Sequence, residues 1–462
     1  MERYIDTHNH TCYSNLRIID SINTVERLIN RAQEIGLKGL VFTEHECLSE
    51  SIQVIEYQEK FPDLKLGIGN EIYLTDTRDN NQKYYHFILV AKDADGHKQL
   101  RELSSIAWVN SYIDKRMERV PTLKKDLRRV IKNNKGHVIA TTACIGGELS
   151  SLILEMEDAR KNKNSALEKE AYNKIISFIE DMLDIFGDDF YIEIPPGASA
   201  EQALVNKKLY QIAKLYNIKI EIACDSHYAK KEDRFVHKAY LNSKTAEREV
   251  DDFYQFAYLQ SEQEILENLY PSFGEDTIKI YNEAVETSKE IYDKITIYDL
   301  RRKQIIPKVS LPEVDKVYNF KPEYPILNSL AASDNIQERY WISECAKAMK
   351  DKGFDGKKEY WERLETEADV IRTIGNKLDD CLFAYFNTFK HYIDLFWACG
   401  SIVGPGRGSS TGFLSNYLLG ITQLDPIRWG LPYWRFLNKE RAELPSLLSI
   451  LGSCKKRTLT IA

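Results

Sequence analysis

Short apolar, β-branched runs alternate with longer helical patterns through the first half of this 462-residue chain. Strands that alternate with helices indicate βα units, whose successive strands pair in parallel. Helices are predicted over residues 21–36, with a capping-box-like start at Ser21 and Gly36 at the end, and over residues 199–216. Seven strands favour a barrel over an open sheet. They are predicted at residues 3–8, 38–43, 64–69, 85–90, 137–141, 189–194 and 218–223.

The second half of the chain has a different organisation. A chain of this length predicts two or three domains. Residues 230–300 are mostly helical, a polar stretch with four prolines at 301–335 predicts an inter-domain connection, and helical periodicity resumes from Asn335 to Cys399. The predicted domains are a barrel at residues 1–235, a helical extension and linker at 236–335, and a third domain at 336–462.

Composition excludes several classes of protein. The N-terminus has no signal-like region, and no apolar run approaches the roughly 18 residues that span a bilayer. Eight scattered cysteines without a Cys-x-x-Cys argue against a disulfide framework or a zinc ribbon. We therefore expect a cytoplasmic protein with no membrane partner. The net charge of −7 gives no global nucleic-acid signature, and the basic run at 115–135 predicts either a solvated amphipathic helix or a local DNA-contacting surface.

Side chains that suit metal coordination follow several predicted strands. His8 and His10 lie at i and i+2, so alternation along a strand turns both imidazoles to one face, where they form half of a divalent-metal site. Barrel active sites are assembled at the carboxyl ends of different strands. His86 instead begins its run, so residues 76–86 are predicted to form a hairpin loop that returns to the site. The other strand-end candidates are His45, Glu71, Cys144, Asp225 and His227.

This ligand set is too large for one tetrahedral zinc. Five histidines, two or three carboxylates and a cysteine suit two or three clustered divalent ions, with zinc, iron or manganese favoured over magnesium alone. Ions about 3.5–4 Å apart can activate water and hold the attacking and leaving oxygens of a phosphoester. The pattern therefore modestly favours hydrolysis over a purely structural metal site that joins the strand ends.

Four short segments carry a family pattern. They are residues 8–14 (His-Asn-His-Thr-Cys-Tyr-Ser), 43–45 (Thr-Glu-His), 140–147 (Ala-Thr-Thr-Ala-Cys-Ile-Gly-Gly) and 225–228 (Asp-Ser-His-Tyr). This pattern resembles the PHP (polymerase and histidinol phosphatase) domain, and more narrowly the PHP domain that begins the bacterial C-family replicative polymerase, the polymerase III alpha subunit. The metal ligands that the resemblance implies are His8, His10, His45, Glu71, His86, Cys144, Asp225 and His227.

Two positions depart from the family pattern. The family usually has an acid shortly after the first motif, where this chain has Arg17, and Asp20 is the nearest substitute. The family also commonly has Asp at the position of Glu44. A ligand set this close to intact implies a metal-dependent 3′–5′ exonuclease that trims the primer end.

A glycine-rich segment, Gly-Pro-Gly-Arg-Gly-Ser-Ser at residues 404–410, is the second landmark. Glycines let backbone N–H groups converge on a phosphate, a following helix N-terminus favours the anion, and Arg407 offers a charged fork. With residues 420–426 and 435–441, the segment resembles the polymerase III alpha palm, where this loop holds the triphosphate of the incoming nucleotide. The implied phosphate-binding residues are Gly404, Gly406, Arg407, Gly408, Ser409 and Ser410.

The palm resemblance stops before its catalytic acids. The family continues with Pro-Asp-x-Asp-x-Asp, which binds two catalytic magnesium ions, whereas no carboxylate follows Glu443 in this chain. We therefore expect the N-terminal portion of a replicative DNA polymerase with an incomplete palm. The portion alone should not polymerise, and we expect it to come from a frameshifted, split or intron-interrupted gene.

Three functional hypotheses follow. In the first, the chain is the N-terminal portion of a replicative DNA polymerase. Its expected partners are then primer-template DNA, dNTPs and a second polypeptide that completes the palm. In the second, the chain acts alone as a PHP-type phosphoesterase or 3′–5′ exonuclease. In the third, it is a non-catalytic module that binds metal and docks on DNA or on a complementing polymerase fragment.

Overall fold

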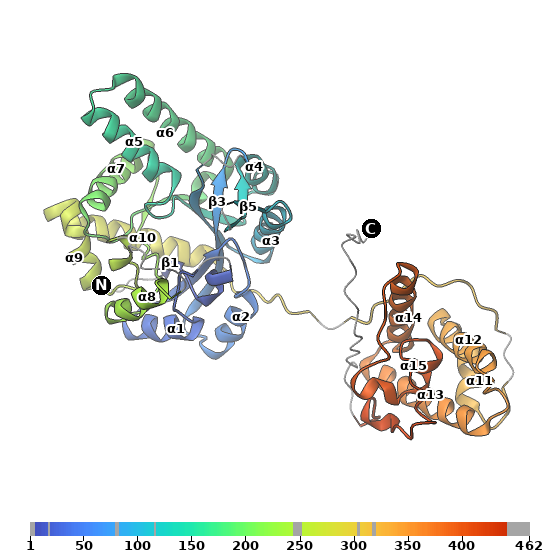
Figure 1. Cartoon of the computed structure of the whole chain (residues 1–462). Helices are drawn as coiled ribbons and strands as arrows, with labels where there is room; N and C mark the ends of the chain where they lie inside the picture. The colour runs from blue at the N-terminus through green and yellow to red at the C-terminus, as the bar shows by residue number, and fades with distance from the viewer. Residues whose placement is uncertain are drawn as a thin grey trace. The chain divides into compact units, whose positions relative to one another are not determined.

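The computed structural model describes residues 5–16, 19–78, 83–114, 117–243, 252–302, 305–316 and 320–440. The chain packs as two compact units, Met1–Arg301 and Arg302–Ala462 (Figure 1). Each unit has its own hydrophobic core. The finer division into domains at residues 235 and 335 stays a prediction.

The first unit is built around a curled eight-stranded sheet. All seven predicted strands form in this sheet, so the α/β class is confirmed. A short eighth strand, β7 (Pro121–Leu123), pairs with the far end of β3, and β5 (Tyr112–Asp114) pairs with β6 (Met117–Arg119) separately. In spatial order the main strands are β1 (Ile5–Asn9), β2 (Gly39–His45), β3 (Lys65–Thr75), β4 (Tyr85–Ala91), β8 (Val138–Thr141), β9 (Phe190–Glu193) and β10 (Ile220–Glu221).

Strand pairing corrects one expectation. β4 is antiparallel to both β3 and β8, whereas the other neighbours along the sheet are parallel. The physical reason is the connection between β3 and β4, which is too short to hold a crossover helix. This connection is the predicted hairpin, although its residues 79–82 lie outside the described part. A single parallel bridge from Asn9 to Ser226 joins β1 to the segment after β10 and brings the curled sheet toward closure.

Helices cover the outside of the sheet (Figure 1). Helix α1 buries Leu28, Ile29 and Ala32 and is capped by Thr24, whose side chain accepts from the Arg27 N–H. The predicted start at Ser21 was therefore wrong by one turn. The helices are α1 (Val25–Glu34), α2 (Ser51–Lys60), α3 (Ala94–Val109), α4 (Lys124–Lys132), α5 (Glu148–Lys161), α6 (Ser165–Phe186), α7 (Ala200–Tyr216), α8 (Arg234–Leu241), α9 (Glu262–Phe273) and α10 (Thr277–Lys294).

The alternation of side chains along the strands separates two cores. On β2, Leu40 and Phe42 pack outward against the helices, whereas Val41 belongs to a smaller inner cluster. Ile291 of α10 joins this inner cluster, and the Ser288 hydroxyl of α10 donates to the carbonyl of Ile5 at 2.8 Å. Helix α10 therefore fills the amino end of the parallel strands, and their carboxyl ends are left for polar side chains.

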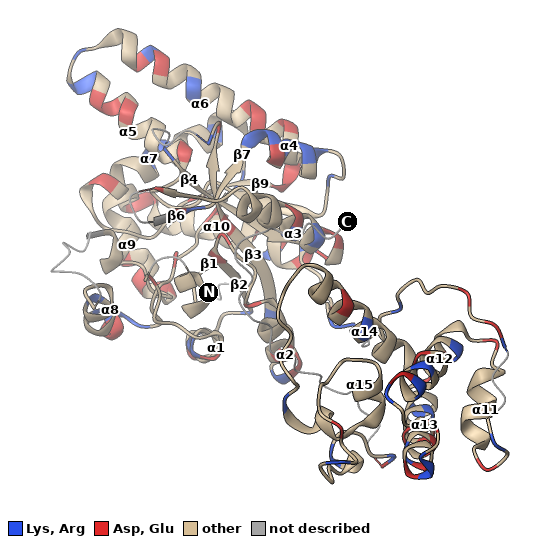
Figure 2. Ribbon diagram, turned by 45° about the vertical axis from the view of Figure 1, so that its right-hand side comes forward, with Lys and Arg blue, Asp and Glu red and all other residues tan. Residues whose placement is uncertain are grey.

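Basic residues of α4 pair with acidic residues of α6, and Figure 2 shows α4 beside one end of α6. Arg128 contacts Asp181 at 2.8 Å and also pairs with Asp184, both on α6. Lys132 lies 2.6 Å from the same Asp184 carboxylate. These pairs favour the amphipathic-helix interpretation over a DNA-contacting surface, since Arg128 and Lys132 already have acidic partners.

The second unit is helical around Trp341, Phe383 and Phe413. Helix α11 lies inside the stretch predicted as a connection, and Pro325 begins it because proline is tolerated in a first helical turn. Across both units, none of the described helices is long and apolar enough to cross a membrane. The helices of this unit are α11 (Pro325–Ala331), α12 (Ile336–Asp351), α13 (Lys358–Leu378), α14 (Phe383–Ala398) and α15 (Leu414–Leu418).

Candidate metal centre

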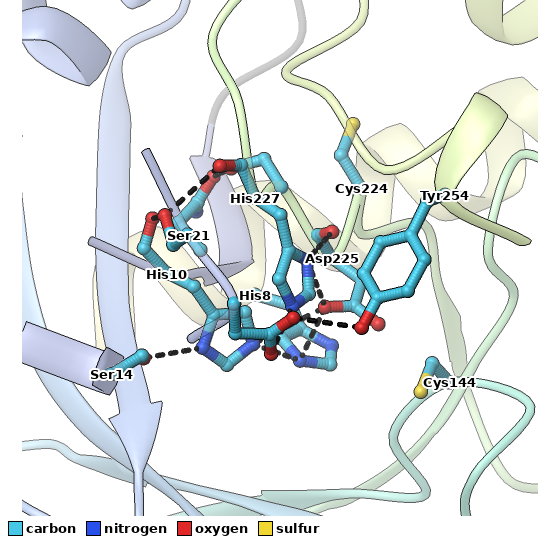
Figure 3. Close-up of polar contacts among 12 residues, drawn as sticks. His8, His10, Ser14, Ser21, Cys144, Cys224, Asp225, His227 and Tyr254 are labelled. Atoms are coloured by element: carbon cyan, nitrogen blue, oxygen red, sulfur yellow. Dashed lines mark hydrogen bonds and ion pairs between the residues drawn. The ribbon is translucent and has the colours of Figure 1, made fainter. Parts of the chain in front are cut away.

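The predicted ligands meet at the carboxyl end of the curled sheet (Figure 3). The Nε2 atoms of His8 and His10 lie 3.1 Å apart, as alternation along β1 predicted. Oδ1 of Asp225 lies 3.3 Å from Nε2 of His8 and 3.2 Å from Nε2 of His10. The Glu71 carboxylate reaches the same rings, with Oε1 3.7 Å from His8 and Oε2 3.4 Å from His10. One compact group of ligand atoms therefore comes from β1, β3 and the segment after β10.

A second group forms around Asp20. Oδ2 of Asp20 lies 2.6 Å from Nε2 of His45 and 3.0 Å from Nε2 of His227. The Tyr254 hydroxyl donates to Oδ1 of the same carboxylate at 2.7 Å. The structure thus places Asp20, the substitute acid predicted from sequence, beside two histidines. Arg17, at the position of the usual acid, lies outside the described residues.

A third group joins Glu71, His86 and Cys144. Nδ1 of His86 lies 2.6 Å from Oε1 of Glu71 and 3.7 Å from Sγ of Cys144. His86 reaches the site although it begins its strand, because antiparallel β4 starts at the edge where β3 carries Glu71. The structure therefore brings His86, the last residue of the predicted loop, beside two other candidate ligands.

Several buried polar atoms at the centre lack a hydrogen-bond partner among the described residues. They are both carboxylate oxygens of Glu71, Oδ1 of Asp225 and Nδ1 of His45. Nδ1 of His45 lies only 2.5 Å from Oε2 of Glu71, yet the pair does not have hydrogen-bond geometry. Burying a carboxylate without a hydrogen-bond partner costs free energy. Buried oxygen and nitrogen atoms that converge without hydrogen bonds to one another are suited to coordinate a cation.

The donor atoms divide into three overlapping sets. Within each set, the ligand atoms lie within 4.8 Å of one another. His10 and Glu71 each belong to two sets, but Glu71 has two carboxylate oxygens and could serve two ions, whereas His10 presents only Nε2 and could serve one. The residues therefore fit two or three divalent ions. The sets are His10, His45 and His227; His8, His10 and Glu71; and Glu71, His86 and Cys144.

Hydrogen bonds from outside the centre orient two of the rings. Nδ1 of His8 lies 2.8 Å from Oε1 of Glu193, so this nitrogen carries the proton. Nδ1 of His10 lies 3.0 Å from the Ser14 hydroxyl, which itself donates to Glu44 at 2.5 Å. In both rings Nε2 therefore faces the centre, the arrangement common around metal-binding histidines. Glu44, at the family's usual Asp position, accepts from Ser14 and so helps to orient His10.

The electrostatics of the centre favour ionised carboxylates and a neutral His10. Burial raises the pKa of Asp225, but His8 and His227 outweigh it and hold this pKa well below its usual range. Burial likewise opposes the effect of His86 and His45 on Glu71, whose pKa is also lowered. Burial, with His45 and His227 nearby, lowers the pKa of His10 to about 3. Burial lowers the pKa of His8, but Asp225, Glu193 and Glu71 outweigh it and raise this pKa to about 10, so a metal ion would have to displace a proton from His8.

The loops that carry the ligands have unusual backbone conformations. Glu46, Ala143 and Asp225 have φ values of 58°, 57° and 48°, a region that non-glycine residues seldom adopt. Glu46 follows His45, Ala143 precedes Cys144, and Asp225 is itself a predicted ligand. A Cβ on Gly147 would lie 2.1 Å from the carbonyl oxygen of Thr142, so the loop after β8 tolerates only glycine there. Such strain is typical of functional sites.

Sequence reasoning missed several supporting residues. Glu193 is the last residue of β9, so the rule that identified His45 at a strand end could have found it. Ser14 lies within the first motif but was not given a role. No sequence signal points to Tyr254, which lies in the 3₁₀ turn Asp252–Gln255 and is far from Asp20 along the chain.

The glycine-rich loop lies in the second unit. Gly406 and Gly408 have φ values of 119° and 71°, and Arg407 is exposed between them. The phosphate-binding role of this loop stays a prediction, and the first N–H groups of α15 are not free for an anion. The N–H groups of Leu414 and Ser415 at the start of α15 already donate to the buried Glu367 carboxylate, at 2.6 and 2.8 Å.

Comparisons with known proteins match both units. A PHP domain model matches residues 6–196, and a model of the bacterial DNA polymerase III alpha NTPase domain matches residues 327–447. The DNA-directed DNA polymerase of Bacillus phage SPbeta is 37% identical over 98% of this chain and 37% of its own length. The DNA polymerase III subunit alpha of Aquifex aeolicus is 27% identical over 96% of this chain and 36% of its own length. The chain thus spans just over a third of these curated relatives.

Solved structures resemble the chain only weakly. The histidinol phosphate phosphatase of Lactococcus lactis aligns with 53% of this chain and 95% of its own, at 15% identity and a TM-score of 0.25. A TM-score of this size supports no conclusion about the site.

Proposed function

We propose that this chain belongs to the bacterial DNA polymerase III alpha family and serves as the N-terminal portion of a replicative DNA polymerase. The whole enzyme would use primer-template DNA, dNTPs and magnesium in the cytoplasm of a bacterial cell or a phage-infected host. The support is the order of the two matched domains and the named polymerases that align with nearly all of the chain.

For the barrel itself, we propose a metal-dependent phosphodiesterase that removes nucleotides from a 3′ end. The observation that carries this proposal is the convergence of the nine predicted ligands around buried oxygens without partners. Two or three ions of zinc, manganese or iron, when bound, would polarise phosphoryl oxygens and activate water.

The chain's own residues have distinct tasks in this proposal. Glu71 offers one carboxylate oxygen to each of two ligand groups. Glu193 and Ser14 keep the protons of His8 and His10 on Nδ1, which leaves Nε2 available to a cation. Tyr254 holds Asp20 through its other oxygen, so that Oδ2 stays directed at His45 and His227.

A labelled-primer assay tests the barrel proposal. The full chain, loaded with Mn²⁺ or Zn²⁺, should shorten a 3′-labelled primer, and His10→Ala should abolish the shortening because His10 belongs to two ligand sets. Trimming that survives His10→Ala would contradict the proposal, and metal binding without trimming would favour a structural site.

The polymerase proposal has a separate test. With a second polypeptide that supplies the family's Asp-x-Asp-x-Asp segment, the chain should support template-directed dNTP incorporation, and it should not do so alone. Failure of the mixture to incorporate dNTPs, when each polypeptide is folded, would argue against the polymerase role and leave the phosphodiesterase proposal in place.

A further inference from the structure

A pocket of about 630 Å³ is lined by residues that include sequence neighbours of the predicted metal ligands. Small-ligand pockets in proteins range over roughly 300–1,000 Å³, so this volume suits a single small molecule or one nucleotide unit. Its walls include Pro196, Cys224, Phe256 and the first turn of α7. We call it the Phe256 pocket.

The walls of the Phe256 pocket continue directly into the ligand-bearing segments. Cys224 precedes Asp225, and Ile145 follows Cys144. Figure 3 shows the Cys224 side chain turned away from the histidines, whereas Asp225 is among them. An occupant of the pocket would therefore lie next to the metal ligands, with its body outside their cluster.

The wall that Phe253 forms is also continuous with a ligand-bearing segment. Phe253 lines the pocket, its ring centroid lies 6.4 Å from that of His227, and the next residue, Tyr254, donates to Asp20. The aromatic wall and the ligands of the second group therefore belong to one packed unit.

The lining suits a flat, uncharged group. No lysine or arginine lines the pocket among the described residues, and its one carboxylate, on Glu201, is exposed. The carbonyls of Pro196 and Phe256 already accept hydrogen bonds from Gln260, at 2.9 and 2.8 Å. The lining offers proline and phenyl surfaces and no cation for a phosphate.

We propose that the Phe256 pocket holds the base of the 3′-terminal nucleotide while its phosphodiester lies at the metal centre. This inference rests on the proposed phosphodiesterase function. Aromatic stacking accepts every base because each has a π face, so trimming should be independent of sequence. In the reaction, water adds to phosphorus, the bond to the penultimate 3′ oxygen breaks, that oxygen takes the proton, and a nucleoside 5′-monophosphate leaves.

Pocket variants test this assignment. Ala200→Trp places a large side chain at the pocket wall, and Phe256→Leu removes a ring while keeping apolar bulk. Leu215→Trp is the matched control, because Leu215 lies on the same helix, is 70% exposed and does not line the pocket. The substrates are two primers that differ only in whether the 3′-terminal residue carries a base or is abasic.

The wild-type chain should trim the normal end about tenfold faster than the abasic end, the size of effect that base stacking supports. Both pocket variants should lose this preference by slowing only the normal end, and Leu215→Trp should keep it. Equal trimming of both ends by the wild-type chain, or equal slowing of both ends by the variants, would overturn the assignment.

A binding measurement separates this inference from the proposed function. Calorimetry on the Mn²⁺-loaded chain compares thymidine 5′-monophosphate with 2-deoxyribose 5-phosphate, which lacks the base. Tighter binding of the nucleotide, lost in Ala200→Trp, supports the pocket even where no primer is trimmed. Equal binding of the two ligands would refute the pocket whatever the trimming assay shows.

Discussion

The Ser14 hydroxyl lies 3.0 Å from Nδ1 of His10 and donates its own proton to Glu44. Since its proton is committed to the carboxylate, the hydroxyl can only accept from the imidazole. His10 is thereby held as the tautomer whose Nε2 faces His8 and Asp225. Ser14 and the buried Glu44 thus orient the predicted ligand His10 without being metal ligands themselves.

Ser14→Ala should weaken metal binding without removing a ligand. Loss of the hydroxyl frees the His10 ring to rotate or change tautomer, and loss of such supporting contacts typically lowers metal affinity by about 10–100-fold. Competition with a chelator measures the affinity. Ser105→Ala, at an exposed position on α3, is the control and should bind metal like the wild-type chain. Unchanged affinity in Ser14→Ala would show that Ser14 does not orient His10.

Glu71→Gln and Cys144→Ser should differ in how many ions they lose. Glu71 belongs to two ligand sets, whereas Cys144 belongs to one. Elemental analysis after reconstitution should therefore show a larger loss of metal for Glu71→Gln. Equal stoichiometry in the two variants would mean that the carboxylate does not serve two ions.

Gly147→Ala should destabilise the first unit. The new Cβ would meet the Thr142 carbonyl oxygen at 2.1 Å, and forced overpacking of this kind costs about 1–3 kcal/mol. Thermal unfolding should show a lower midpoint for this variant. Gly356→Ala is the control, because nothing lies within 4 Å of a Cβ there, and the two midpoints should differ.

His97 should make the first unit less stable in mild acid. It is buried on α3, and burial together with Arg101 lowers its pKa from 6.5 to about 4. As pH falls from 6.5 toward 4, the unfolded chain takes up this proton first, so stability present above pH 6.5 is progressively lost. The loss should reach about 1–2 kcal/mol near pH 5.

Hydrogen exchange of α3 and β4 amides at pH 7 and pH 5 measures this loss. His97→Gln should reduce the difference in protection between the two pH values, because glutamine does not titrate. His391→Gln, at an exposed position, should leave it unchanged. An equal pH dependence in wild type and His97→Gln would contradict the assignment.

The sequence predicts the strands well because each is a short apolar run, but it does not predict their direction. The reversal of β4 depends on a short connection after β3, and that reversal brings His86 beside Glu71. Ser21 resembles a helix cap locally, yet its hydroxyl faces two backbone carbonyls of the site, at 2.9 Å from that of His10 and 3.0 Å from that of His227. Tertiary contacts outweigh local preference at this position.

In the candidate site, too, some residues can be predicted from the sequence and others only from the folded structure. Residues at strand ends, such as His45 and Asp225, can be identified from the sequence because strand ends meet at one edge of the sheet. The hydrogen bond from Tyr254 to Asp20 joins residues 234 positions apart, so only the folded chain reveals it. The capping of α15 by Glu367 is equally hidden, because the acid comes from the neighbouring helix α13.

The central claim is that the barrel holds a cluster of divalent ions. Elemental analysis of the purified full chain beside a His8→Ala/His10→Ala variant tests it most directly, with circular dichroism to confirm that the variant is folded. We predict two or three equivalents of zinc, manganese or iron in the wild-type chain and a loss of most of this metal in the variant, since these histidines supply two of the three ligand sets. A wild-type chain that retains no metal after reconstitution, or a folded variant with the same metal content, would contradict the claim.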